Sequence, residues 1–481
     1  MSKETNIMQR VLSDIHAEDI LYCVWKGRVK LDEVFAGTED LDVLVNPADV
    51  TAFVQTLAAH QFFEVRKMAA KSDIGARDFF HMDASGRVFH IHIHTQIIFG
   101  NALIRDYHVP IEHDLLRARI WDDDHEIWCA TPEHDQFLFL CRHSARKKNG
   151  FYVSFKSEYA SLRAFYDGVD LDPELIPTIV PAARAALIND TAAQSGAGRR
   201  GICQDLKPFR LKGRALSKMA AFVALAWVAL LKRLGFAQAG VSVMQGGGMM
   251  VAFVGIDGSG KSSALERYKD RFSKRVGIET ISMGSGQSGA SFVRRIMFSV
   301  FGTKAKLKGH TAARESGDRA GKPKKFPWYY QLWLIICLWE KRSQLRRGLN
   351  AQRLGKIVLV DRWLQTQLLI AIDAPRTTNL ATTGRLSDYL AALEADIFRL
   401  SDSLSPDLMF VMDVSPENSV KRKPEDLTLE RAKVVRENLL SIVWPAKRVV
   451  IIDANDDIPT VDANIVAEIN KDISGLDLRD E

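Results

Sequence analysis

The second half of the chain alternates short, uninterrupted apolar runs with longer stretches in which apolar residues recur at helical spacing. The runs are five or six residues long and occupy residues 249–254, 279–283, 356–360, 408–412 and 448–452. Strands buried on both faces of a parallel sheet have this continuous apolar character, and helices connect such strands. The pattern predicts an α/β domain at residues 249–470 with a parallel five-stranded sheet, followed by a tail at residues 471–481.

The first 150 residues have a different pattern, in which short strand-like segments and helical segments follow one another. The expected elements are a helix at residues 48–59 and strands at residues 20–25, 41–45, 77–82 and 87–94. Pro47 suits the start of the helix, and residues 83–86 (Asp-Ala-Ser-Gly) suit a hairpin turn between the last two strands. We expect an α+β domain at residues 1–150 and a helical extension at residues 151–190.

Residues 191–248 connect these parts and combine a basic linker with an apolar helix. The linker carries Ser, Gly, Arg and Lys without periodicity, whereas residues 216–234 have helical spacing with a centre that is apolar all round. Such a helix is either buried or lies at a membrane interface. The sequence leaves both interpretations open.

The composition is typical of a soluble globular protein, with 481 residues of which 47% are hydrophobic and 26% charged. Five cysteines without a Cys-x-x-Cys pair favour a reducing compartment over a disulfide framework. The first residues lack the apolar core of a secretory signal, and no apolar run is long enough to span a bilayer. We therefore predict a cytoplasmic protein.

The net charge of +6 is unevenly distributed. Lys and Arg are concentrated in residues 189–236 and 294–325, whereas the rest of the chain is acidic on balance. Each basic segment is either solvated or attracts phosphates or an anionic surface. A weak association with anionic membranes and a homodimer are left open, and no specific nucleic-acid partner is expected.

Residues 255–262 match the phosphate-loop pattern GxxxxGK[ST] at every position. An apolar run precedes the match and helical spacing follows it, so backbone N–H groups at the helix start can bind phosphate oxygens. Lys261 should reach the β- and γ-phosphates, and the Ser262 hydroxyl should bind Mg²⁺. The predicted ATP-binding residues are Gly255, Gly258, Ser259, Gly260, Lys261, Ser262 and Ser263.

Asp361 and Arg362 follow the apolar run at residues 356–360. A carboxylate at the carboxyl end of a buried parallel strand lies beside the phosphate loop in a sheet of this kind. We expect Asp361 to hold Mg²⁺, directly or through water, and Arg362 to bind an acceptor phosphate. The alternative is a surface ion pair at the end of a strand.

The motifs of residues 249–470 resemble those of thymidylate kinases and recur in that family's order. Residues 253–262 are similar to the family's opening strand and loop, and Asp361-Arg362-Trp363 resembles its DRY motif. Arg342 precedes Asp361 by nineteen residues, where the family keeps a substrate-contacting Arg. Residues 406–417 and 449–454 resemble two further strands of the family.

This resemblance implies roles for individual residues. Asp257 would contact the acceptor near its hydroxyl or transferring group, and Arg342 and Arg362 would grip the acceptor phosphate. Lys421, Arg422 and Lys423 would lie at the start of a lid over ATP. The catalytic set implied is therefore Lys261, Asp257, Arg362 and Arg342.

A second motif lies near the N-terminus, where Gly27 is followed by Asp40-Leu-Asp42 on an expected strand. This arrangement resembles nucleotidyltransferases of the DNA-polymerase-β type. Side chains alternate along a strand, so Asp40 and Asp42 share one face and could bind one metal ion. The alternative is a pair of solvated carboxylates at the start of a strand.

The nucleotidyltransferase family needs a third carboxylate on a later strand, and residues 88–94 offer none. They instead place His90, His92 and His94 on one face. Such a row binds a metal ion, contacts an anionic substrate or forms a polar sheet face, and the sequence leaves all three open.

The leading hypothesis is an ATP- and Mg²⁺-dependent kinase that acts on a nucleoside monophosphate, thymidylate-like, or on a related phosphorylated or sugar acceptor. The partners would be a nucleotide and a small phosphorylated substrate. One alternative is a nucleotidyltransferase acting through the N-terminal domain, with a regulatory phosphate-loop domain. Another is a non-catalytic ATPase switch that docks on an anionic surface.

Overall fold

The computed structural model of the protein forms two compact units. They comprise Met1–Gly246 with Ile473–Glu481, and Gly247–Asp472. The structure describes residues 6–67, 76–83, 87–100, 105–148, 151–189, 196–211, 223, 226, 242–272, 276–284, 328–368, 373–377, 384–424 and 428–477. The basic segment expected at residues 294–325 lies outside them, as does the apolar helix at residues 216–234 apart from residues 223 and 226.

The first unit is built on an eight-stranded mixed sheet with the order β12-β3-β4-β5-β2-β1-β9-β8. The strands are β1 (Tyr22–Lys26), β2 (Leu41–Val45), β3 (Phe63–Lys67), β4 (Ala76–Met82), β5 (Val88–His94), β8 (Ile120–Asp122), β9 (Ile127–Cys129) and β12 (Ser242–Met244). β4 and β5 pair antiparallel, and β2 and β5 pair parallel. β2 therefore lies next to the histidine-rich strand β5.

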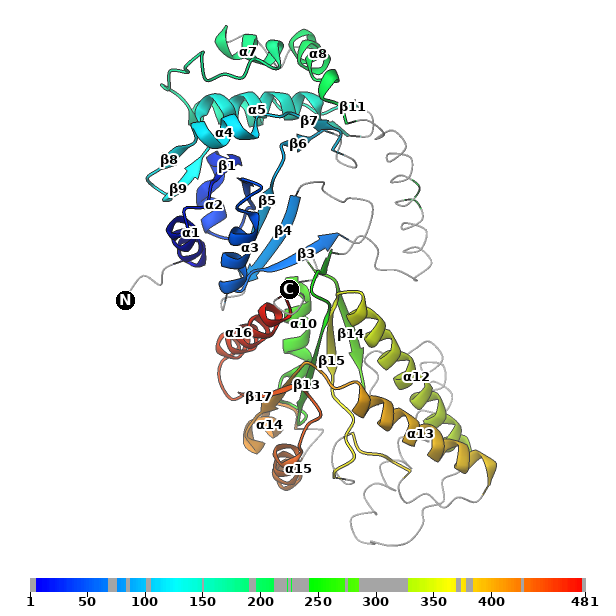
Figure 1. The fold of residues 1–481 in the computed structure, drawn as a ribbon. Helices are drawn as coiled ribbons and strands as arrows, with labels where there is room; N and C mark the ends of the chain where they lie inside the picture. The colour runs from blue at the N-terminus through cyan, green and yellow to red at the C-terminus, as the bar shows by residue number, and fades with distance from the viewer. Residues whose placement is uncertain are drawn as a thin grey trace. The chain divides into compact units, whose positions relative to one another are not determined.

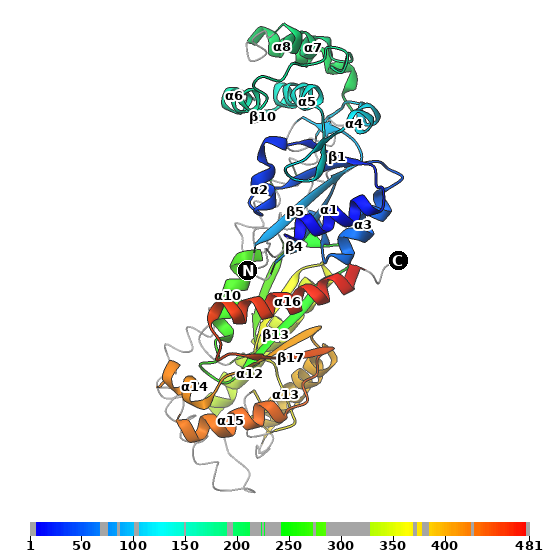
Figure 2. The same ribbon diagram turned by 90° about the vertical axis from the view of Figure 1, so that its left-hand side faces the viewer.

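Helices cover this sheet and share two apolar cores with it (Figure 1). The helices of the unit are α1 (Ile7–Ala17), α2 (Leu31–Phe35), α3 (Val50–Ala59), α4 (Glu112–Ala118), α5 (Pro132–Ala145), α6 (Lys156–Phe165), α7 (Pro181–Ile188) and α8 (Gly196–Asp205). Figure 2 shows α1 beside α3, and these two pack against each other. The buried residues of α5 to α8 form one core with β1, so the helices after residue 150 belong to the same unit.

Local sequence explains where helices α1 and α5 begin. The Asn6 side chain accepts a hydrogen bond from the N–H of Met8, and Gln9 closes a capping box at the start of α1. α5 begins with Pro132 in its first turn, and the Thr131 side chain caps it. Short pieces complete the unit: β6 (Ile98–Phe99) pairs with β7 (Tyr107–His108), and β10 (Lys147–Lys148) pairs with β11 (Phe151–Tyr152).

The second unit contains the parallel five-stranded sheet expected from the apolar runs. Its order is β14-β15-β13-β16-β17, and every neighbouring pair is parallel. The strands are β13 (Met249–Gly255), β14 (Ile278–Ser282), β15 (Ile357–Asp361), β16 (Leu408–Asp413) and β17 (Arg448–Asp453). Every residue of the central strand β13 is buried, which explains its continuous apolar sequence.

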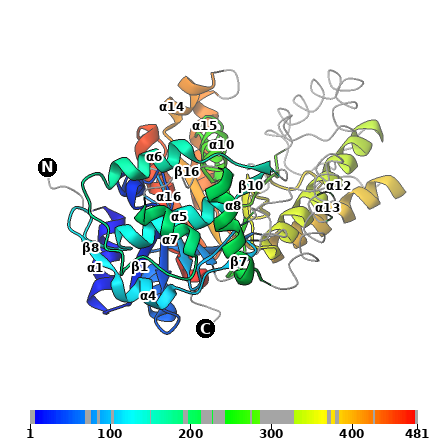
Figure 3. The ribbon, with the colours of Figure 1, turned by 90° about the horizontal axis from the view of Figure 1, so that it is seen from above.

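Helices flank both faces of this sheet. They are α10 (Lys261–Phe272), α12 (Trp328–Arg353), α13 (Arg385–Ser403), α14 (Pro416–Arg422), α15 (Leu429–Ser441) and α16 (Ile458–Asp477). α12 packs on the sheet, and α13 runs beside α12 (Figures 1 and 3). None of the helices in the described part of the chain is both long and apolar enough to cross a membrane.

Candidate functional site

The phosphate loop connects the central strand β13 to helix α10. Gly258 and Gly260 have φ angles of 83° and 86°, in the left-handed region that favours glycine. A Cβ atom at Gly258 would lie 2.7 Å from the backbone oxygen of Ser419 on α14. Gly258 is therefore required both for its backbone angle and for the close approach of α14.

Lys261 is buried and folds back over the loop. Its Nζ donates hydrogen bonds to the carbonyl oxygens of Gly255 and Ile256, at 2.8 and 2.7 Å, and to Ser259 Oγ at 3.2 Å. Burial, together with the charge of Arg362, lowers the pKa of Lys261 to about 8. The ammonium group thus lies inside the loop, where a phosphate oxygen can take over its hydrogen bonds.

Asp361 ends β15, directly beside the loop, because Asp361 pairs in register with Phe253 of β13. Its Oδ1 is buried and has no hydrogen-bond partner among the residues that the structure describes. Ser262 and Ser263, in the first turn of α10, are exposed. An uncompensated carboxylate oxygen and an accessible hydroxyl are oxygen ligands of the kind that Mg²⁺ prefers, so these residues fit a Mg²⁺ ion.

Arg362 lies where β15 ends and has a left-handed φ of 70°, which is unusual for a residue with a side chain. Its guanidinium lies 2.5 Å from Asp257 Oδ1 and 3.7 Å from Asp373 Oδ2. Burial alone would raise the pKa of Asp257, but the charges of Arg362 and Lys261 lower it. The Arg362 guanidinium therefore lies between the carboxylates of Asp257 and Asp373, beside the phosphate loop.

A small pocket opens beside this arginine. Its lining is mostly apolar and consists of Val254, Gly255, Arg362, Asp373, Val435, Leu439, Ile442 and Trp444. Burial raises the pKa of Asp373, although the charges of Arg362 and Lys341 oppose that effect. Asp373 and Lys341 were not among the residues predicted from the sequence: Asp373 lies in an irregular segment without a motif, and Lys341 lies on α12 directly before Arg342.

The other predicted residues of this site are placed less centrally. Arg342 forms an ion pair with Asp396 of α13 at 3.2 Å, and no contact in the described ranges joins it to Arg362. Arg422 donates hydrogen bonds to the carbonyl oxygens of Gly258 and Ala454, at 3.3 and 3.0 Å. Arg422 thus reaches the loop, whereas Arg342 does not contribute to the same cluster.

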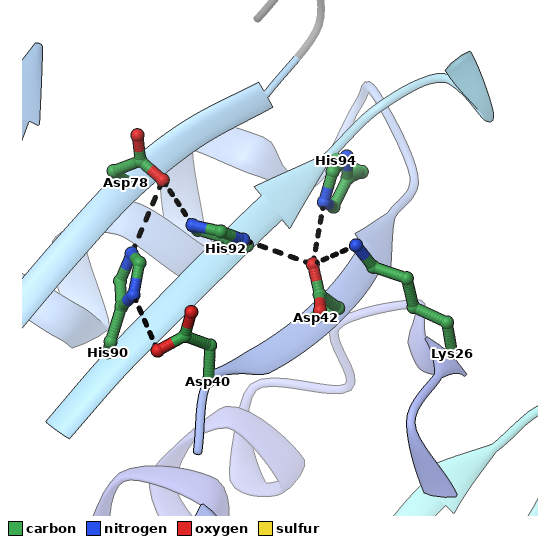
Figure 4. Close-up of polar contacts among 7 residues, drawn as sticks. All are labelled: Lys26, Asp40, Asp42, Asp78, His90, His92 and His94. Carbon is green, nitrogen blue, oxygen red and sulfur yellow. Dashed lines mark hydrogen bonds and ion pairs between the residues drawn. The ribbon is translucent and has the colours of Figure 1, made fainter. Parts of the chain in front are cut away.

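A second polar cluster lies on the sheet of the first unit (Figure 4). His92 pairs in register with Asp42 of β2 on one side and with Asp78 of β4 on the other. Asp42 Oδ1 lies 3.1 Å from His92 Nδ1, 3.1 Å from His94 Nε2 and 2.8 Å from Lys26 Nζ. One carboxylate oxygen thus faces three nitrogen atoms from β1 and β5.

Asp78 and Asp40 flank the same cluster. Asp78 Oδ1 lies 2.5 Å from His92 Nε2 and 3.3 Å from His90 Nε2, and Asp40 Oδ1 lies 2.9 Å from His90 Nδ1. Asp78 was not predicted from the sequence, because the third carboxylate of the nucleotidyltransferase pattern was expected on residues 88–94. With the expected turn at residues 83–86, Met82 would lie opposite Arg87 and Asp78 opposite Ile91, whereas the structure pairs Asp78 with His92, one residue further along.

The charges of the cluster are strongly coupled. Burial would raise the pKa of Asp42, but Lys26 and the two histidines lower it well below its usual range. Burial would lower the pKa of His92, but Asp42 and Asp78 raise it to about 9. Burial dominates at His94 and lowers its pKa to about 4. His92 is therefore the charged imidazole of the two.

Comparisons with known proteins agree with the phosphate loop. The chain is 25% identical over 180 residues to the uncharacterized ATP-binding protein YghR of Escherichia coli strain K12, which covers 37% of this chain and 69% of that protein. It is 26% identical over 235 residues to the thymidylate kinase of Dinoroseobacter shibae, covering 46% of this chain and 96% of that enzyme. No family model matches the chain.

Among solved structures, deoxyadenosine kinase from M. mycoides with bound dATP aligns with 46% of this chain and all of that chain, at 17% identity and a TM-score of 0.28. The phosphate loop and these relatives in sequence indicate a P-loop, kinase-like nucleotide-binding unit. Two relatives in sequence are thus an uncharacterized ATP-binding protein and a thymidylate kinase.

Proposed function

We propose that the second unit is a kinase that transfers the γ-phosphoryl group of ATP to a nucleoside monophosphate, thymidylate-like, or to a related phosphorylated or sugar acceptor. The observation that carries this proposal is the pairing of Arg362 with Asp257 beside a pocket at the phosphate loop. A nucleotide switch needs the phosphate loop but does not need a cation beside it that could bind a second substrate. The thymidylate kinase of Dinoroseobacter shibae, similar over nearly its whole length, supports the same reaction class.

The loop residues would bind ATP. Backbone N–H groups between Gly255 and Lys261 would hold the phosphates, and the Lys261 ammonium would exchange its loop carbonyls for β- and γ-phosphate oxygens. Ser262 and Asp361 would hold Mg²⁺, which when bound neutralises phosphate charge. Phosphoryl transfer depends on positioning and charge neutralisation, so this residue set suffices.

The acceptor would enter from the side of Arg362. Its phosphate would replace the carboxylate of Asp257 as the partner of the guanidinium, because a doubly charged phosphate attracts Arg more strongly. The released Asp257 could then accept a hydrogen bond from an acceptor hydroxyl. The apolar wall with Trp444 and Leu439 would contact the remainder of the acceptor.

Purified full-length protein incubated with labelled ATP and a panel of nucleoside monophosphates and sugar phosphates tests this proposal. We expect label on one acceptor class, and Lys261→Ala should abolish it, since removing one phosphate-stabilising cation costs orders of magnitude in rate. Lys269→Ala is the matched control, because Lys269 is exposed on the same helix. ATP hydrolysis without transfer to any acceptor would contradict the kinase and support the switch.

For the first unit we propose a nucleotidyltransferase-like fold. The adjacency of β1, β2 and β5, with Asp40 and Asp42 beside a third strand, supports it. An imidazole, His92, lies on β5 opposite Asp42, which argues against nucleotidyl transfer itself. A cytoplasmic location, a homodimer and weak membrane association remain predictions.

A further inference from the structure

The histidine cluster of the first unit has the composition of a metal site rather than of an ordinary sheet face. We propose that Asp42, His92 and His94 bind one divalent transition-metal ion, with Zn²⁺ as the expected type. Imidazole and carboxylate are common ligands of Zn²⁺, whereas Mg²⁺ prefers an all-oxygen shell. This proposal concerns the first unit and does not depend on the kinase function of the second.

The distances between the ligand atoms fit a tetrahedral ion. Asp42 Oδ1 lies 3.1 Å from both His92 Nδ1 and His94 Nε2, and all three atoms lie within 4.8 Å of one another. Ligands about 2.0–2.1 Å from a tetrahedral ion are separated by roughly 3.3–3.4 Å. Small side-chain adjustments, together with release of the Nδ1 proton of His92 to solvent, would bring all three atoms into coordination, with one position left for water or an anionic oxygen.

The surroundings orient the ligands as metal sites require. A histidine that binds a metal through one ring nitrogen usually presents the other to a carboxylate. His92 does so, since its Nε2 lies 2.5 Å from Asp78 Oδ1 while its Nδ1 faces Asp42. The ring of Trp25 packs edge-on against His94, with centroids 5.1 Å apart, and provides an apolar wall.

A second group, Asp40 with His90 and His92, offers ligand atoms at similar separations. Both groups include His92, whose Nδ1 lies 3.1 Å from Asp42 Oδ1 and whose Nε2 lies 2.5 Å from Asp78 Oδ1. Asp40 is also the more exposed carboxylate, at 38% against 14% for Asp42. The first group is therefore the better site, and His90 serves to orient Asp78 and Asp40.

The proposed metal ion would bind Asp42 where the ammonium group of Lys26 now lies. Lys26 Nζ lies 2.8 Å from the same Asp42 oxygen, and the Lys26 side chain is 21% exposed, so it has a path outward. An incoming ion must displace this ammonium group. Removing the charge by Lys26→Met should therefore raise the affinity for the metal ion. If the cluster serves only as an ion pair, the same variant should show no increase in metal affinity.

The test is titration of metal-stripped full-length protein with Co²⁺ and Zn²⁺. Tetrahedral Co²⁺ with nitrogen ligands absorbs visible light, so its spectrum reports coordination without any activity assay. We expect one equivalent to bind, and Mg²⁺ at equal concentration not to compete. Zn²⁺ should also raise the thermal unfolding temperature, because it binds only the folded state.

Variants identify the ligands. His94→Gln and Asp42→Asn should abolish the Co²⁺ spectrum, and Asp78→Asn should weaken binding roughly 10- to 100-fold. His125→Gln is the control, since His125 forms its own pairs with Asp122 and Asp32. A circular dichroism spectrum of each metal-free variant separates loss of the site from loss of the fold, and a rise in affinity for Lys26→Met cannot come from misfolding.

Several outcomes would overturn the proposal. These are no stoichiometric Co²⁺ binding by the wild-type protein, binding that persists in a folded His94→Gln variant, and unchanged affinity in Lys26→Met. Loss of the spectrum in His90→Gln but not in His94→Gln would assign the ion to the other group and equally refute this one. None of these results would affect the kinase assay, which depends on Lys261.

Discussion

Two glycines of the phosphate loop differ in one respect that stability measurements can isolate. Gly258 and Gly260 have nearly the same left-handed φ, 83° and 86°. A Cβ atom at Gly260 would meet nothing within 4 Å, whereas one at Gly258 would lie 2.7 Å from the oxygen of Ser419 and 3.3 Å from its Cα. Alanine at either position imposes the same backbone strain, but only at Gly258 does it also collide with α14.

The expected magnitudes follow from these contacts. The left-handed conformation costs an alanine about 1–2 kcal/mol, partly offset by about 0.4–1 kcal/mol of lost freedom in the unfolded chain. Gly260→Ala should therefore destabilise by about 1 kcal/mol. Gly258→Ala adds a forced backbone shift of α14, and overpacking of this kind costs about 1–3 kcal/mol more.

Scanning calorimetry of the nucleotide-free full-length protein is the appropriate assay. For a domain of this size, about 1 kcal/mol lowers Tm by about 2–4 °C. We expect that decrease in Gly260→Ala and at least about twice as much in Gly258→Ala. Equal decreases in the two variants, or a larger one in Gly260→Ala, would show that α14 does not approach the loop as the structure has it.

Three further predictions address the acceptor, pH and the basic segments. Arg362→Lys should raise KM for the acceptor at least tenfold with little change in KM for ATP, because Lys lacks the bidentate geometry; steady-state kinetics that show the reverse would place Arg362 on the ATP side. Burial, together with the charge of Arg142, lowers the pKa of His143 to about 4. The unfolded chain therefore binds more protons, and stability present above about pH 6.5 should be lost as the pH falls toward 4, by up to about 1.4 kcal/mol per pH unit. His143→Gln should flatten the pH dependence of urea unfolding over that window, and an unchanged slope would contradict it. If the basic segments dock on membranes, the protein should co-sediment with anionic but not with neutral vesicles, and salt should weaken this binding. Equal binding to both vesicle types, or binding to neither, would show that the basic segments are solvated instead.

The parallel sheet could be predicted closely because its signal is local. Strands buried on both faces must be apolar at every position, and β13, β15 and β16 begin and end within a residue or two of the expected runs. The phosphate loop could be predicted equally well, since the backbone angles of Gly258 and Gly260 require glycine at these positions of the motif. Both features depend on neighbours in the sequence.

The side-chain partners that complete the sites could not be predicted in the same way. Asp373 reaches Arg362 from an irregular segment, and Asp78 reaches His92 only through the register of a hairpin. Arg342 lies on a helix whose orientation is set by its packing with α13, which brings it to Asp396. These contacts arise from tertiary packing, which residue spacing alone does not encode.

The short strand β12 has a practical consequence for dissecting the protein. Its three residues pair with Val65, Arg66 and Lys67 of β3, yet they lie just ahead of β13 in the chain. Expressing the first unit with a C-terminus at Leu211, after α8, would remove this neighbour and leave the N–H and C=O groups on that edge of β3 unpaired. Bare edges of this kind recruit strands from other molecules, so such a fragment should aggregate more than one extended through Gln245, in which β12 pairs with β3.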